Sequence, residues 1–252
     1  MDKELTLSFD ELIGICLLAG KIMLQSGAET YRVEDTMSRI AASVGLPVSH
    51  SYVTPTGIIF QSGDAGSARM IRIAERTTDL EKVAAVNAIS RQLGEGKLSA
   101  AKASALLQEI DTARHAYSVP LQIAAASIAS GCFAIMFKGS WADFAPALIS
   151  GGIGFAAVIL LQHLVRIKFF AEFSASFLVG LLSYLLVQAG IGQELDKIII
   201  GSVMPLVPGL LITNAVRDLM AGHLVSGLSR GAEAFLTAFA IGAGIAVVFT
   251  FF

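Results

Sequence analysis

The chain has 252 residues, of which 54% are hydrophobic and only 15% charged, and its mean hydropathy is +0.70. Soluble domains average about 45–50% apolar and about 25% charged residues, so this composition excludes an ordinary soluble globular protein. The net charge of −2, without a block of like charges, gives no electrostatic footprint for nucleic acid, and no nucleic-acid partner is expected.

The charged residues are concentrated in the first part of the chain. Residues 1–117 contain 26 of the 38 Asp, Glu, Lys and Arg residues, and the remaining 135 residues contain only 12. This division predicts a small α/β domain over residues 1–115 and an α-helical membrane domain over 116–252. The first residues are acidic where a secretory signal is basic, so the α/β domain is expected to stay in the cytoplasm.

Four helices are predicted in the α/β domain. The first is amphipathic and runs from about Asp10 to Gln25. Ser26–Glu29 and Thr78–Glu81 match the capping box, a hydroxyl residue followed three positions later by Glu, and predict the starts of the second and third helices. Ser99 is predicted to cap the fourth helix.

Three β-like runs separate the second and third predicted helices. They cover residues 48–53, 57–61 and 69–74, and Gly63-Asp64-Ala65-Gly66 is predicted to form the turn between the last two. The predicted order is therefore ααβββαα, and it leads directly into the membrane domain.

Five uncharged runs of 19–23 residues follow, bounded by charged residues. Each matches the ~20 residues that a helix needs to cross a ~30 Å hydrocarbon layer. Lipid offers no hydrogen-bond partner to open backbone groups, so helices are required. Five transmembrane helices are predicted, at about residues 116–137, 144–165, 172–193, 198–216 and 231–252.

The loop charges predict the orientation. With residues 1–117 inside, the inner loops carry four basic residues and the outer loops two, in agreement with the positive-inside rule. The inner residues are Arg166, Lys168, Arg217 and Arg230, and the outer ones are Lys138 and Lys197. The chain is expected to be a multi-pass protein of the cytoplasmic membrane, with its N-terminus in the cytoplasm and its C-terminus outside.

The fourth predicted span is interrupted by Pro205, Pro208 and Gly209. The two prolines remove backbone donors, and a helix broken at membrane depth exposes backbone groups that can hold a substrate. Asn214 and Arg217 follow within three turns and complete the candidate substrate-binding set. The alternative is a Pro kink that only improves packing, with Arg217 and Asp218 at the cytoplasmic interface.

Three acidic residues are candidates for proton coupling: Asp218, Glu172 and Glu233. Partial burial raises the pKa of a carboxyl toward neutrality, as a proton carrier requires. The alternative for Glu172 and Glu233 is a structural acid near a helix N-terminus. Ala238, Gly242 and Ala246 place small residues at four-residue spacing on the fifth span, which predicts a packing face for a neighbouring helix or a partner subunit.

Motifs of catalysis and metal binding are missing from the sequence. Gly96-Lys97 lacks the remainder of a phosphate loop, and Gly152–Ala157 fits a dinucleotide fingerprint only inside an uncharged span, where helix packing explains it better. Cys16 and Cys132 lie in separate helical stretches and are predicted to form neither a metal pair nor a disulfide. No enzyme activity, cofactor or metal is expected.

Four segments together resemble the threonine/serine exporter family, in particular its N-terminal half. They are SGAETYRVEDTM (26–37), TPTGI (54–58), RTTDLEKVAAVN (76–87) and PLVPGLLITNAVRDLMAGHLVSGLSR (205–230). Fused members of that family carry ten spans, so a chain with five resembles the large subunit of the split form. The resemblance implies proton-driven export of threonine and serine or of succinate-like dicarboxylates, together with a small membrane subunit that supplies the complementary helices.

The leading hypothesis is therefore a subunit of a secondary-active exporter that works by alternating access around the broken fourth span. Its partners would be the bilayer, the small subunit and a small polar metabolite. The alternative is a membrane-anchored metabolite sensor or enzyme that acts through the α/β domain.

Overall fold

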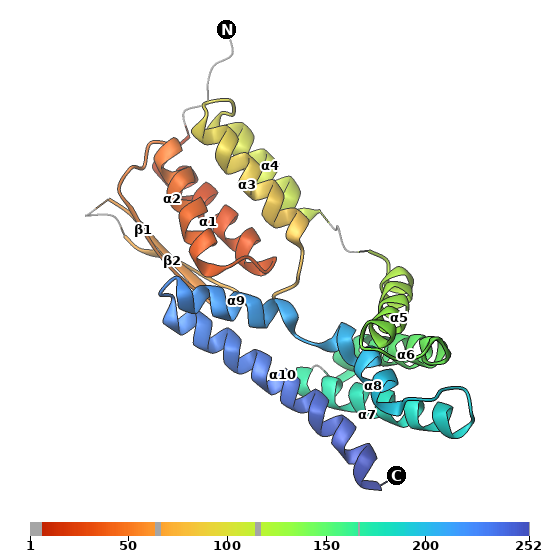
Figure 1. Ribbon diagram of the computed structural model, residues 1–252. Coiled ribbons are helices and arrows are strands. Elements are labelled where there is room, and N and C mark those ends of the chain that lie inside the picture. The colour runs from red at the N-terminus through yellow and green to blue at the C-terminus, as the bar shows by residue number, and fades with distance from the viewer. Residues whose placement is uncertain (1–6, 64–66, 114–116, 166, 252) are drawn as a thin grey trace. The chain divides into compact units, whose positions relative to one another are not determined.

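The computed structural model describes residues 7–63, 67–113, 117–165 and 167–251 (Figure 1). Its chain divides into two compact units. We call residues up to 116 together with 210–231 the N-terminal unit, and residues 117–209 together with 232–252 the membrane unit. The predicted turn at 64–66, the predicted domain boundary at 115–116 and the inner-loop Arg166 lie outside the described residues.

The N-terminal unit begins with helices α1 (Phe9–Gln25) and α2 (Thr30–Ser43). A three-stranded antiparallel sheet follows, in the order β1 (Ser49–Thr54), β2 (Gly57–Ser62) and β3 (Arg69–Arg72). The helices α3 (Leu80–Gly94) and α4 (Ala100–Thr112) complete the N-terminal part of the unit. The predicted small sheet between two pairs of helices is confirmed.

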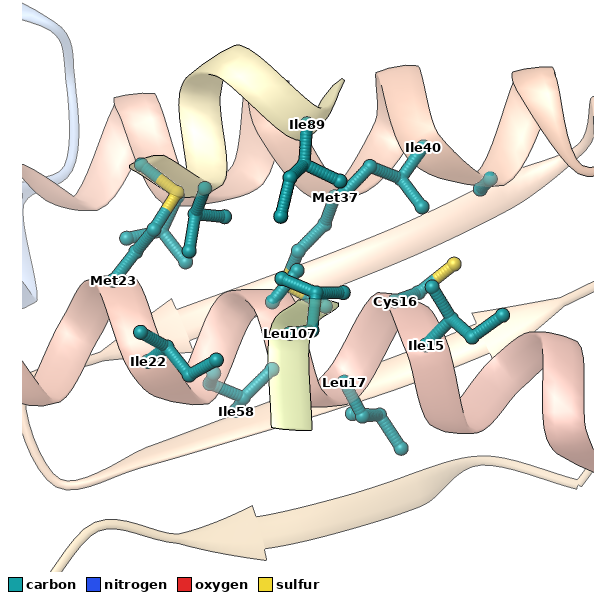
Figure 2. Packing of buried hydrophobic residues seen from close by; sticks show 14 of the residues in the cluster. Ile15, Cys16, Leu17, Ile22, Met23, Met37, Ile40, Ile58, Ile89 and Leu107 are labelled. Carbon is teal, nitrogen blue, oxygen red and sulfur yellow. The ribbon is translucent and has the colours of Figure 1, made fainter. Parts of the chain in front are cut away.

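The core of this unit is formed by one face of each of these helices and one face of the sheet. Figure 2 shows side chains of α1, α2, α3, α4 and β2 meeting there, among them Met23, Met37, Ile58, Ile89 and Leu107. Strand alternation places Ile58 and Phe60 inside while Ile59 faces out. Burying each large aliphatic side chain contributes roughly 1.5–3 kcal/mol, so this core can hold the unit together.

The predicted capping box at Ser26–Glu29 is wrong. Ser26 still donates its backbone N–H to Ile22 and therefore belongs to the end of α1. Gly27 takes the left-handed conformation, with φ of 91°, and Ala28 donates to Met23, which closes α1 with a Schellman-type end. Helix α2 starts only at Thr30, with Glu29 as an N-cap that makes no side-chain capping bond.

The other helix starts agree better with the sequence. Ser8 forms a capping box with Glu11 at the start of α1, and Ser99 accepts from the Lys102 N–H as predicted. At α3 the N-cap is Asp79 instead of Thr78, because the Asp79 carboxylate accepts from the Lys82 N–H. An aspartate is as good an N-cap as threonine or better.

The membrane unit contains α5 (Val119–Met136), α6 (Trp141–Val165), α7 (Lys168–Gln188), α8 (Leu195–Val203), a 3-10 turn at Met204–Leu206 and the larger part of α10 (Leu224–Phe251). Within the described residues, α5, α6, α7 and α10 are long and apolar enough to cross a membrane. The bent pair formed by α8 with its 3-10 turn and α9 (Gly209–Met220) raises the number to five if it is one span.

Helices of the membrane unit approach one another at glycines. A Cβ on Gly201 of α8 would lie 2.7 Å from the backbone nitrogen of Ala134 in α5, and one on Gly244 of α10 would meet the backbone of Phe173 in α7. Gly154 in α6 likewise leaves room for Val179 of α7. Small residues allow such close approach in membrane proteins, where apolar burial does not drive helices together.

Helix α10 is longer than a single span requires. Its 28 residues extend about 42 Å at 1.5 Å per residue, against ~30 Å of hydrocarbon. The residues up to Gly231 belong to the N-terminal unit, and those from Ala232 onward to the membrane unit. The remainder is close to the ~20 residues of one crossing.

Candidate functional site

The polar residues that follow the predicted break gather on one face of α9. Asn214, Ala215 and Asp218 are buried, at the spacing of one helical face, whereas Leu210, Ile212 and Val216 are exposed. The buried face packs within the N-terminal unit against the loop between α1 and α2. Helix α9 therefore presents polar groups to the protein and apolar groups to its surroundings.

Asp218 is at the centre of this site and is fully buried. Its carboxylate accepts from the backbone N–H of Thr30 at 2.9 Å and from the Thr30 hydroxyl at 3.0 Å. The Arg230 guanidinium of α10 lies 3.3 Å from the same carboxylate. The Thr30 N–H, at the start of α2, has no acceptor within the helix and is bonded to this carboxylate instead. The positive N-terminal end of the helix dipole favours a negative charge at this position.

Asn214 and Arg217 hold the same loop from the adjacent turn of α9. The Asn214 amide donates to the Gly27 carbonyl at 2.8 Å, and Arg217 pairs with the Glu29 carboxylate. Burial alone would raise the pKa of Glu29, but hydrogen bonds to its own backbone and to Arg217, with the charges of Arg217 and Arg32, hold that pKa below its ordinary value. Arg217 itself remains half-exposed.

Two side chains from the start of α10 complete the cluster. Arg230 is buried and donates to the Ala28 carbonyl at 2.8 Å, and Ser226 donates its hydroxyl to the Val53 carbonyl of β1 at 3.2 Å. Gly222, with φ of 86°, ends α9 in the left-handed conformation. This lets the backbone N–H of His223 donate to the backbone carbonyl of Asp218. The turn thereby directs both helices toward the same loop.

Glu34 of α2 lies beside this cluster. Its carboxylate accepts from the Val53 N–H at 2.9 Å, and His223 Nε2 is 3.9 Å away. Burial raises the pKa of Glu34 above its ordinary value, and the nearby charge of Asp218 adds to the rise, although the Val53 N–H and His223 oppose it.

The predicted break is present in the structure, immediately before α9. Helix α8 ends at Val203, Pro205 lies in the 3-10 turn, and Val207 is extended before Pro208. The chain passes from the membrane unit to the N-terminal unit between Gly209 and Leu210, directly after the break. The residues predicted to bind substrate are therefore divided: Pro205, Pro208 and Gly209 in one unit, Asn214 and Arg217 in the other.

The remaining two proton-coupling candidates lie together in the membrane unit. Lys168, the first residue of α7, donates to the Glu233 carboxylate of α10 at 2.8 Å. Glu172, one turn further along α7, is buried, and the charges of both Lys168 and Glu233 act on it. Its Oε2 atom has no partner at hydrogen-bond distance among the described residues, although the Thr237 hydroxyl of α10 is close enough to act on the Glu172 carboxyl.

Sequence reasoning missed the other side of the Asp218 site. In the sequence, Ser26–Glu29 is interpreted as a helix start and Arg230 as an inner-loop charge, and neither is linked to Asp218. Their contacts join residues 187 to 202 positions apart. A signal was available, because buried charges need partners and the sequence after the break contains the opposite charges Asp218 and Arg230 on either side of Gly222. Within the described part of the chain, no group of three or more His, Cys, Asp or Glu residues could hold a metal ion.

Comparison with known proteins gives the family of this chain. Residues 14–252 match the family described as "Putative threonine/serine exporter". The chain belongs to this family. It is therefore a member of a family of transporters and not of enzymes, with several apolar helices that make it a multi-pass membrane protein. No solved structure matches the chain.

Three relatives of this chain differ in how much of their own length is matched. The chain is 24% identical over 243 residues to "Probable succinate transporter subunit YjjP" of Escherichia coli, with 94% of the chain and 93% of that protein covered. The protein of the same description from Klebsiella aerogenes is 23% identical, with 94% and 92% covered. The "Threonine/serine exporter" of Corynebacterium glutamicum is 22% identical over 93% of the chain but only 50% of its own length.

Proposed function

We propose that this chain is one subunit of a secondary-active exporter and works with a second membrane subunit. Two relatives of matching length are described as transporter subunits, and a third relative, described as a threonine/serine exporter, is about twice as long as the part of it that this chain matches. In this proposal a complementary chain supplies the equivalent of the unmatched half of that longer relative. An odd number of spans suits this arrangement, since two related five-span halves would form an inverted pair.

The fifth predicted span offers a surface for that second subunit. Ala238, Gly242 and Ala246 of α10 are all exposed, and a Cβ built on Gly242 meets no atom within 4 Å. The buried side of α10 is a different one and includes Ala234, Ile241 and Val248. Small residues at four-residue spacing permit close packing of a neighbouring helix.

The exported substrate in this proposal is a small carboxylate-bearing metabolite, with succinate-like dicarboxylates ahead of threonine and serine. The two relatives whose full length is matched carry succinate in their descriptions. Arg217 suits a carboxylate of either substrate class, because a guanidinium binds carboxylates in a bidentate manner. Its half-exposed guanidinium would exchange Glu29 for the carboxylate of the substrate.

The observation that carries the mechanism is the coincidence of the helix break with the boundary between the two units at Gly209 and Leu210. Alternating access requires an element that links parts able to move, and Pro205, Pro208 and Gly209 interrupt the chain at this boundary. The N–H groups of the first turn of α9 have no intrahelical acceptors and carry the positive end of the helix dipole. Together with Asn214 and Arg217, they form the proposed binding site.

Proton coupling in this proposal depends first on Glu172. Glu172 is buried, and a buried carboxyl is costly to ionise in a membrane protein, where such groups serve proton relays. Glu233, paired with Lys168, would pass the proton on, and Asp218 is the third candidate. The N-terminal unit would face the cytoplasm and the C-terminus the outside, as the loop charges predict.

The test is uptake into inverted membrane vesicles, in which the cytoplasmic side faces the medium. Radiolabelled succinate, serine and threonine are offered under a pH gradient to vesicles that contain this chain alone, the second subunit alone, or both. Gradient-dependent accumulation of one substrate only in the paired vesicles is the expected result. Accumulation by this chain alone would contradict the requirement for a second subunit, and no accumulation in any sample would contradict the exporter itself.

A further inference from the structure

A groove of about 500 Å³ lies within the N-terminal unit between α2 and α3, apart from the Asp218 site. The two helices run in the same direction here, since Thr36 contacts Asn87 and Gly94 approaches Ser43. Tyr31 and Leu80 therefore line one end of the groove, and Arg39 and Arg91 line the other. A volume of this size is typical of small-molecule sites.

The side chains that line the groove carry more positive than negative charge. Three arginines line it, Arg32, Arg39 and Arg91, against a single carboxylate, that of Asp35. Asp35 pairs with Arg39 at 2.5 Å, and Arg32 is shared with Glu29 at 3.5 Å. The Arg91 guanidinium, by contrast, makes no hydrogen bond or ion pair within the described ranges of the chain. A cationic groove that leaves a guanidinium available attracts anions.

The opposite end of the groove is apolar. Leu80 is 54% exposed and Tyr31 is 37% exposed, although both border a hollow in a folded domain. Val83 and Ala84 extend this surface along α3, and the Asn87 amide lies between it and the arginines. An occupant that covers Leu80 and Tyr31 would remove apolar surface from water while its charged head remains at Arg39 and Arg91.

We propose that this groove binds a small organic anion with an apolar or aromatic body and a doubly charged head, a phosphate monoester or a dicarboxylate. The head is held by Arg39 and Arg91, and the body lies on Tyr31 and Leu80. This site lies beside the proposed substrate site, since Arg32 in its lining pairs with Glu29, and its occupancy does not require transport. An effector bound in this groove would contact the same unit that contains α9.

The test uses the purified full-length chain in detergent and calorimetric titration with three probes. Phenyl phosphate carries both the body and the head, inorganic phosphate only the head, and benzyl alcohol only the body. We expect phenyl phosphate to bind best and to weaken as salt is added. Arg91→Gln should reduce its affinity by about tenfold or more, because a charge-assisted hydrogen bond is lost.

Arg72→Gln is the matched control, since Arg72 is an exposed arginine of β3 outside the groove. It should leave the affinity unchanged, and Leu80→Ser should weaken phenyl phosphate but not inorganic phosphate. The proposal is overturned if phenyl phosphate does not bind at millimolar concentration, or if Arg91→Gln and Arg72→Gln have equal effects. Binding of a short-chain phosphatidic acid without binding of phenyl phosphate would overturn it in favour of a lipid headgroup.

Discussion

The two units treat their buried polar groups differently. In the N-terminal unit the buried charges Glu29, Asp218 and Arg230 all have partners of opposite charge. Among its described residues, the buried side-chain atoms without a hydrogen bond are the Ser90 hydroxyl and Arg230 Nη1, and the latter still lies 3.3 Å from the Asp218 carboxylate. In the membrane unit the Asp143 carboxylate accepts hydrogen bonds from the backbone of Ser140, Gln193 and Glu194. Four buried oxygen atoms of its described residues lack a partner at hydrogen-bond distance: Ser150 Oγ, Ser183 Oγ, and Glu172 Oε2 and Thr237 Oγ1, whose side chains interact with each other.

The two units also differ in how their apolar residues pack. The N-terminal unit has one large apolar core, whereas buried apolar residues in the membrane unit form small clusters such as Ala134, Ala147 and Ile198. The membrane unit also exposes the small-residue face of α10, which agrees with the proposal that a helix of a second subunit packs there.

The largest expected effect follows from removing one of the paired buried charges of the N-terminal unit. Asp218→Ala leaves the buried Arg230 without its carboxylate and the Thr30 N–H without its acceptor. Removing one partner of a buried pair costs about 3–5 kcal/mol, so the thermal unfolding temperature of the purified chain should fall markedly. Asp196→Ala is the control, because Asp196 pairs with Lys197 at the surface.

A double variant separates this explanation from a general loss of packing. Asp218→Ala with Arg230→Met removes both charges and should recover much of the lost stability. An unfolding temperature that is equal in Asp218→Ala and Asp196→Ala would contradict the role given to Asp218.

The corresponding change in the membrane unit should affect activity more than stability. Glu172→Gln keeps the size of the side chain and removes its proton-carrying group. In paired vesicles, accumulation driven by the pH gradient should be lost, while exchange of labelled for unlabelled substrate continues. Glu194→Gln, at an exposed carboxyl before α8, should keep both activities. Gradient-driven accumulation at the normal rate in Glu172→Gln would exclude this carboxyl as the proton carrier.

Two glycines of α10 test whether its two sides have different partners. Gly244→Ala forces a methyl group against the backbone of Phe173 in the same chain and should cost about 1–3 kcal/mol of stability. Gly242→Leu meets no atom of this chain, so its unfolding temperature should not change, but co-purification of the second subunit should be lost. If Gly242→Leu retains the second subunit, the proposed surface is wrong.

Variants of Arg217 distinguish a role in holding the loop between α1 and α2 from a role in binding substrate. Because the guanidinium is half-exposed, Arg217→Gln should reduce stability by only about 1 kcal/mol or less. If the substrate carboxylate replaces Glu29 on this residue, the half-saturation concentration for export should rise in Arg217→Gln but not in Arg32→Gln, which also loses a pair with Glu29. Equal values in the two variants would leave Arg217 with only a structural role.

The smallest effect concerns pH. Because burial raises the pKa of Glu34 above its ordinary value of 4.5, the folded state binds this proton more tightly than the unfolded state. Its contribution to stability is therefore present below pH 4.5 and is lost as the pH rises through the raised pKa. Glu29, with its lowered pKa, has the opposite effect and loses its contribution as the pH falls through that pKa.

The unfolding temperature measured in a pH series checks this assignment. Glu34→Gln should lack the component that declines above pH 4.5, whereas Asp35→Asn, at a neighbouring exposed carboxyl, should retain it. Identical pH profiles for Glu34→Gln and the unmodified chain would show that Glu34 does not titrate in the expected direction.

Much of this fold follows from local patterns. Uncharged runs predict the long helices, alternation predicts the three strands, and Pro205 with Pro208 predicts the break, because each depends on residues close in sequence. The predicted start of α2 is wrong for the same reason: Ser26 and Glu29 match a capping box, but the left-handed Gly27 closes α1 there and α2 begins only at Thr30. A local pattern does not show whether such a segment closes the helix before it or starts the helix after it.

The Asp218 site was beyond such reasoning. Asn214, Arg217 and Asp218 were singled out because polar groups after a break are unusual, yet their partners Gly27, Glu29 and Thr30 are almost two hundred residues earlier. Periodicity identifies a buried face but not the surface that covers it. The structure supplies that second surface, and the predicted role of Asn214 and Arg217 in binding substrate remains a proposal.

The central claim is that the break between α8 and α9 opens alternately to the two sides of the membrane. It is tested by a single cysteine at Val207, which is extended and 38% exposed, in a paired complex whose Cys16 and Cys132 are replaced by alanine. Labelling with a membrane-impermeant thiol reagent is measured in inverted and right-side-out vesicles. The account predicts labelling from both sides, in a ratio that shifts when substrate or a pH gradient is applied. Labelling from one side only, unchanged by substrate or gradient, would contradict it.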